Sequence, residues 1–176
     1  MRKLFSNGLV VVAGVVSLPG NNPVADPAKP VAAECRKEHD LRLASLRSFF
    51  RKGNCPAAEL SPVFLEAADS NALDWRLLPS ISFIESTGGK FARNNNIFGW
   101  DSGRAAFRSA VEAVRSVASS LARSATYRHK GVDEILHAYN PDADYAAKVK
   151  YVMRRIAPRE KLYSRLTGPI PLVDNQ

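Results

Sequence analysis

Cysteine and histidine are scarce in this sequence of 176 residues. There are two cysteines, Cys35 and Cys55, and three histidines, of which only His39 lies near the cysteines. A structural zinc site needs four ligands of this kind. The sequence therefore argues against a metal centre, and no motif in it predicts a bound cofactor.

A hydrophobic run long enough to cross a membrane is also lacking, because a spanning helix needs about 20 apolar residues. The apolar stretch at residues 9–18 is shorter and follows Arg2 and Lys3. This pattern is typical of a secretory signal peptide. We therefore expect residues 1–33 to be a signal peptide and linker without a defined cleavage point. The protein is then exported to the periplasm, cell envelope or extracellular space, with no stable membrane span; an uncleaved anchor is the alternative.

Export affects the interpretation of the two cysteines. In an oxidising compartment an even number of cysteines favours disulfide formation. A Cys35–Cys55 bridge would close a loop of roughly 20 residues and stabilise the fold by about 3 kcal/mol in the chain-entropy model. Two buried free thiols are the alternative.

Acidic residues are too few to balance the basic ones, since 17 Asp and Glu stand against 25 Lys and Arg, for a net charge of +8. Without residues 1–33 the same count leaves +6. No nucleic-acid-binding motif is present, and export argues against a nucleic-acid partner. We expect a monomer that binds an anionic polymer of the cell envelope.

No run of β-type residues is long enough for a large sheet, and the apolar residues instead recur at helical spacing, so we expect a mainly α fold. The predicted helices lie near residues 41–50, 61–71, 77–85, 111–121, 132–139 and 145–156. The third either starts near Leu77, with Pro79 in its first turn, or starts after Asp74 and is kinked at Pro79. Residues 87–104 are rich in glycine and asparagine and predict either a loop or a small β-hairpin lobe. Residues 158–176 contain Pro169 and Pro171 and predict an extended C-terminal tail.

Glu85 is the strongest candidate for a catalytic residue. At helical spacing it shares a face with Leu78 and Ile81, so we expect its carboxyl group to be buried. Burial raises the pKa of a carboxyl group, and an acid that stays protonated near neutral pH can donate a proton to a leaving group. The alternative is an ordinary solvated or salt-bridged glutamate at a helix end.

Three motifs carry a resemblance to a known family: Ile84–Gly89 (Ile-Glu-Ser-Thr-Gly-Gly), Asn95–Trp100 (Asn-Asn-Ile-Phe-Gly-Trp) and Tyr139–Val149. Over residues 61–157 the chain resembles the bacterial glucosaminidase family of the lysozyme-like superfamily, and also the lytic transglycosylases. The resemblance implies a lysozyme-like α+β domain at residues 34–157, with the loop lobe beside the catalytic helix. It also implies an endo-β-N-acetylglucosaminidase that acts on peptidoglycan or a related amino-sugar polymer.

The resemblance assigns roles to individual residues. Glu85 would be the general acid, and Tyr139 would face it across the cleft. The family's second carboxylate lies in the loop lobe, and here the sequence departs from the family, because Asp101 is the only acid between Glu85 and Glu112. Either Asp101 serves as that carboxylate or a group of the substrate itself attacks, as in lytic transglycosylases; a surface turn aspartate is the alternative for Asp101. Candidate substrate-binding residues are Ser86, Asn96, Phe98, Trp100 and Tyr145. For Ser86 and Asn96 the alternative is a role in the turn, and for Phe98 and Tyr145 it is a place in the core. A non-catalytic wall-binding module is the alternative function.

Overall fold

A computed structural model describes residues 28–157 of the chain. The helices are α1 (Ala28–Lys52), η1 (Pro56–Ala58, a 3-10 helix), α2 (Ser61–Ser70), α3 (Leu77–Ser86), α4 (Ala110–Arg123), α5 (Val132–Tyr139) and α6 (Ala143–Ile156). No strand occurs in these residues, so the mainly α prediction is confirmed. Residues 87–109 form a series of turns, which corresponds to the loop and not to the β-hairpin alternative.

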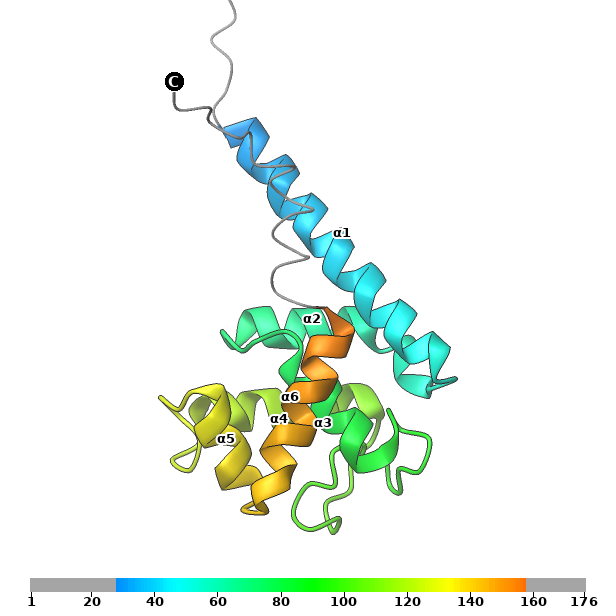
Figure 1. Cartoon of the computed structure of the whole chain (residues 1–176), viewed down its shortest axis with the longest axis vertical. Helices are drawn as coiled ribbons and strands as arrows, with labels where there is room; N and C mark the ends of the chain where they lie inside the picture. The colour runs from blue at the N-terminus through cyan, green and yellow to red at the C-terminus, as the bar shows by residue number, and fades with distance from the viewer. Residues whose placement is uncertain (1–27, 158–176) are drawn as a thin grey trace, which may run out of the picture.

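The first helix is longer than the sequence indicates. α1 begins at Ala28, so residues 28–33, which we assigned to the linker, are helical, and the domain boundary at residue 34 falls inside α1. Figure 1 shows the N-terminal part of α1 projecting away from the other helices, while its C-terminal part packs against them. In that packed part Leu46 and Phe50 are fully buried. The predicted signal peptide at residues 1–27 and the predicted tail at 158–176 lie outside the described residues.

The centre of the helical body is α3, which packs most extensively against α6 and also contacts α2. Leu78 and Ile81 of α3 are fully buried, as is Val149 of α6. Pro79 lies in the first turn of α3, where its missing N–H leaves no hydrogen bond unmade. The helix therefore starts where the sequence indicates and needs no kink.

A buried ion pair connects the start of α3 to the end of α6. Arg76 is 6% exposed, and its guanidinium contacts Asp74 at 2.6 and 2.9 Å while donating a third bond to the carbonyl oxygen of Ala157 at 3.0 Å. Charge-assisted bonds of this kind are stronger than neutral ones. Arg76 therefore holds Ala157, the residue after α6, against the N-terminus of α3.

The predicted disulfide is wrong, because both cysteines are free thiols: Cys35 is exposed on α1 and Cys55 is buried. The Cys55 amide donates to the carbonyl of Phe50 at 3.0 Å. Cys35 lies 15 residues before Phe50 on the same helix, a separation of about 22 Å at 1.5 Å per residue. The Cα atoms of a disulfide lie within about 7 Å of each other, so the rigid helix keeps the thiols apart.

Hydropathy gives no sign of a transmembrane segment in residues 28–157, since none of their helices is both long enough and apolar enough to cross a bilayer. The apolar stretch at residues 9–18 lies outside the described residues.

The two thiols should differ in reactivity. Cys35 is exposed, whereas burial raises the pKa of the Cys55 thiol and so suppresses its reactive thiolate. Iodoacetamide applied to the native protein without reductant should add one group, at Cys35, and a second only after unfolding, as read by intact-mass spectrometry. If the unfolded, unreduced protein takes up no label, a disulfide is present and this part of the fold is incorrect.

Candidate active site

Glu85 lies in the last turn of α3, at the point where this helix leaves the core. Leu78 and Ile81, on the same face, are fully buried, but Glu85 is exposed, so the prediction of a buried side chain is wrong. At Glu85 the contacts come from Tyr145 at the start of α6 and from the loop at Gly99.

The end of α3 is set by a left-handed turn. Thr87 has φ of 53° and donates to the carbonyl of Phe83, and Gly88, with φ of 61°, donates to that of Ser82. A Cβ atom at Gly88 would lie 3.0 Å from atoms of Phe50 and Cys55, so only glycine fits without a shift. This close approach ends the helix directly after Glu85 and Ser86.

Tyr145 is the direct partner of Glu85. Its hydroxyl donates to Oε1 of Glu85 at 2.7 Å, and its ring is 5% exposed. Partial desolvation raises the pKa of the Glu85 carboxyl, and the hydrogen bond from Tyr145 opposes that rise because it stabilises the carboxylate. The net shift is upward, so Glu85 stays protonated at higher pH than an ordinary glutamate.

Gly99 lies against the other carboxyl oxygen of Glu85. A Cβ atom at position 99 would be 2.7 Å from Oε2, and the backbone there has φ of +62°, which favours glycine. The missing side chain therefore makes room for the acid. Together, Tyr145 and Gly99 define the positions of both carboxyl oxygens.

Ser86 and Asn96 hold the loop and do not face the cleft. The Ser86 hydroxyl donates to the carbonyl of Ile97 at 2.7 Å and accepts from the Gly89 amide at 2.9 Å. The Asn96 side chain binds the amide and the carbonyl of Trp100, at 2.8 and 3.0 Å. Both side chains are buried, and their polar atoms are hydrogen-bonded within the protein. The geometry therefore corresponds to the turn-forming alternative for each.

Tyr139 and Phe98 also serve to fix the loop. Phe98 is fully buried, so its ring belongs to the core and cannot stack on a sugar. The Tyr139 hydroxyl donates to the carbonyl oxygen of Phe98, and its ring lies nearly parallel to that of Tyr145, with centroids 5.9 Å apart. Tyr139 therefore lies behind Tyr145, the tyrosine that contacts the acid, and its proton is bound to the backbone. Tyr145, for which a core position was the alternative, is the residue that contacts Glu85.

A cavity of about 440 Å³ opens beside these residues. It is lined by Gly99, Trp100, Asp101, Ser102, Tyr127 and Tyr139. Trp100 forms its aromatic wall, with ring centroids 6.0 Å from Tyr127 and 5.7 Å from Tyr139. Because Gly99 touches Glu85 and also lines the cavity, the cavity adjoins the acid.

Tyr127 was not identified from the sequence, and Gly99, although part of the Asn95–Trp100 motif, was given no role of its own. Tyr127 follows α4 in a polar segment without helical periodicity, and Gly99 is one of several glycines in the loop. The position of Gly99 between two aromatic residues, Phe98 and Trp100, was a weak indication of a close backbone approach. Tyr127 has no local signal, because only the packing of its ring against Trp100 brings it to the cavity.

Asp101 lines the cavity but is paired with Arg104. The two side chains are exposed and meet at 2.7 Å, and the hydrogen bond from Arg104 lowers the pKa of the Asp101 carboxyl. Neither Glu85 nor Asp101 contributes to the pKa shift of the other. The two groups therefore do not behave as a tightly coupled pair of acids.

Within residues 28–157, no group of three or more His, Cys, Asp or Glu side chains could hold a metal ion. No known family model matches the chain, and no characterised protein or solved structure matches it significantly. The functional argument therefore depends on the geometry of this site and on the motifs in the sequence.

Tyr145→Phe should raise the pKa of Glu85 further. The substitution removes the one hydrogen bond that stabilises the carboxylate and leaves the ring in place. The pKa can be measured by ¹³C NMR titration of the labelled carboxyl group. Tyr151→Phe, on the exposed face of α6, is the control and should leave the titration unchanged. An unchanged or lower pKa in Tyr145→Phe would show that the bond does not form in solution.

Gly99→Ala should destabilise the protein more than Gly103→Ala. Both glycines have positive φ, so both variants carry the backbone strain of about 1 kcal/mol. Only at position 99 does the new Cβ meet Glu85, whereas nothing lies within 4 Å of it at position 103. The difference in urea unfolding free energy isolates the contact with the carboxyl group. Equal losses in the two variants would mean that Glu85 does not lie against Gly99.

Proposed function

We propose that this protein cleaves the β-1,4 bond between amino sugars in peptidoglycan, with Glu85 as the general acid. The proposal rests mainly on one observation: a carboxyl group of raised pKa is held by Tyr145 beside a cavity walled by aromatic rings. It includes the expectation of a lysozyme-like architecture, in which a helix carries the acid to the edge of a cleft.

The chemistry assigns different tasks to the two oxygens of Glu85. Oε1 accepts the bond from Tyr145, so the acidic proton resides on Oε2, next to Gly99. That proton passes to the glycosidic oxygen as the bond to the anomeric carbon breaks and an oxocarbenium-like centre develops. The resulting Glu85 carboxylate can then take a proton from the attacking nucleophile.

The cavity beside Glu85 is suited to a sugar. Trp100 and Tyr127 offer flat apolar surface for the face of a pyranose ring, and the indole N–H and phenol hydroxyl offer polar contacts at its edge. Its volume of about 440 Å³ lies in the range typical of small-ligand sites. In this proposal Trp100 and Tyr127 bind the glycan, while Ser86, Asn96, Phe98 and Tyr139 hold the loop that carries Trp100.

Intramolecular attack, as in lytic transglycosylases, is the second candidate reaction. It is favoured by the state of Asp101, whose carboxylate is bound to Arg104 and shows no coupling to Glu85. Asp101 is the one acidic residue among the described residues that line the cavity, and Arg104 engages its carboxylate, so the 6-hydroxyl or N-acetyl group of the substrate can act as the nucleophile. The product distinguishes the routes: hydrolysis leaves reducing ends and attack by the 6-hydroxyl leaves 1,6-anhydro ends.

Export and charge support the choice of polymer. The apolar stretch near the N-terminus predicts passage to the envelope, and the net charge of +6 that remains without residues 1–33 suits an anionic wall. The alternative of a wall-binding module without turnover shares these features. It does not explain why an acid of raised pKa should be held by two specific contacts.

Glu85→Gln should reduce the clearing of purified peptidoglycan by at least about 100-fold, since a general acid contributes roughly 10²–10⁴ to the rate. Turbidity loss measures the rate, and mass spectrometry of the fragments identifies their ends. Glu59→Gln, an exposed glutamate on the surface, is the control and should keep full activity.

The pH profile gives a second measure of the same group. Because the pKa of Glu85 is raised, activity should persist above the pH at which an ordinary glutamate loses its proton, and should then fall as Glu85 ionises. If the wild type and Glu85→Gln clear the wall equally, Glu85 is not the acid. If both bind the wall and neither clears it, the binding-module alternative is correct.

A further inference from the structure

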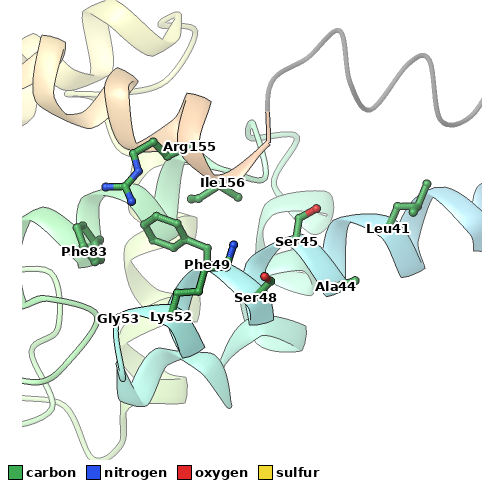
Figure 2. A pocket seen from close by; sticks show the side chains of 10 residues that line it. All are labelled: Leu41, Ala44, Ser45, Ser48, Phe49, Lys52, Gly53, Phe83, Arg155 and Ile156. Carbon is green, nitrogen blue, oxygen red and sulfur yellow. The ribbon is translucent and has the colours of Figure 1, made fainter.

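A second cavity lies between α1, α3 and α6 and has a volume of about 610 Å³. Figure 2 shows its lining residues, which are Leu41, Ala44, Ser45, Ser48, Phe49, Lys52, Gly53, Phe83, Arg155 and Ile156. We call it the α1–α6 groove. Phe83 and Glu85 are two residues apart on α3, so their side chains point about 200° apart around the helix. The groove is therefore on the opposite face of α3 from the acid.

The floor of the α1–α6 groove is apolar. Phe49 of α1 and Phe83 of α3 meet edge to face, with ring centroids 5.0 Å apart, and both are half-buried. Leu41, which is half-buried, adds aliphatic surface, whereas Ile156 is only 6% exposed and belongs mainly to the core. Apolar surface left open between three helices is a site where a further apolar group gains free energy by leaving water.

The sides of the groove carry positive charge only. Lys52 and Arg155 are exposed and reach toward it from α1 and α6, and no Asp or Glu lines it. The Arg155 guanidinium lies 5.9 Å from the centre of the Tyr151 ring, and neither cation forms an ion pair with a carboxylate of the described residues. By contrast Arg42 and Arg115, also on the surface, each pair with a carboxylate. The groove thus combines an apolar floor with two cations that form no ion pair among residues 28–157.

The shape of the groove indicates an elongated ligand. From Leu41 to Lys52 its α1 side is about 16 Å long at 1.5 Å per residue. The residues in the middle of that side, Ala44, Ser45 and Ser48, are small, so a second backbone can come close to α1. A length of this kind accommodates about three turns of helix or five extended residues.

We propose that the α1–α6 groove binds an acidic amphipathic segment of a partner protein. The apolar side chains of this segment cover Leu41, Phe49 and Phe83, and its carboxylates face Lys52 and Arg155. Binding of a helix or strand along an apolar groove is a common mode of peptide recognition, and the complementary charges supply register and selectivity. The inference does not depend on the proposed glycosidase activity, because the groove uses none of the residues around Glu85.

The test uses a fluorescein-labelled peptide of 12 residues built from Leu, Ala and Glu, with the apolar residues at helical spacing, and measures fluorescence polarisation with the full chain. We expect saturable binding that weakens as salt is added, because screening reduces the attraction between the charges. The same peptide with Gln in place of Glu should bind at least about fivefold more weakly.

Matched variants locate the site. Lys52→Gln with Arg155→Gln should weaken binding about tenfold. Lys37→Gln with Arg154→Gln removes two exposed cations from the same two helices but outside the groove, and should leave binding unchanged. Ser48→Trp, which fills the middle of the groove from an exposed position, should abolish binding without unfolding the protein, as checked by circular dichroism.

Several outcomes would overturn the proposal: no binding of the acidic peptide, equal binding of the Gln peptide, or equal weakening in the two double variants. A second copy of this chain as the occupant would instead appear as a dimer in light scattering that Ser48→Trp dissociates. Binding should be unaffected by Glu85→Gln. Failure of the peptide to bind and failure of wall cleavage are therefore separate results.

Discussion

The packing of α3 against α6 determines where each candidate catalytic group lies. α3 carries Glu85 at its end, and α6 carries Tyr145 at its start, so the contact between the two helices places the phenol hydroxyl on the carboxyl group. The Arg76 ion pair joins the same two helices at their other ends through the Ala157 carbonyl. A change in the angle between these helices would separate the acid from its hydrogen-bond donor.

The loop after α3 depends on polar side chains that are satisfied within the protein. Ser86, Asn96 and Tyr139 each bind backbone groups of the Ile97–Trp100 region. Since buried polar groups are costly when unpaired, these bonds define the loop conformation. They also explain why residues of a polar type, which from the sequence appear suited to a substrate, are instead needed to present Gly99 and Trp100 to the cleft.

α3 lies between two cavities, one near each of two opposite faces. On one face Glu85 adjoins the aromatic cavity, and on the opposite face Phe83 forms part of the floor of the α1–α6 groove. A ligand on the groove side would contact the helix that carries the acid without entering the cleft.

The sequence by itself determined the helices, since α2 to α6 begin and end within a few residues of the predicted limits. Their apolar residues recur with the 3.6-residue period. Pro79 and Gly88 mark the start and the end of α3 through their own backbone preferences. The sequence also identified Glu85 at a helix end. Periodicity shows which face a residue occupies but not what covers that face. The exposure of Glu85, its bond to Tyr145 across 60 residues, the entry of Tyr127 into the cavity and the separation of the two thiols were therefore decided only by the tertiary structure.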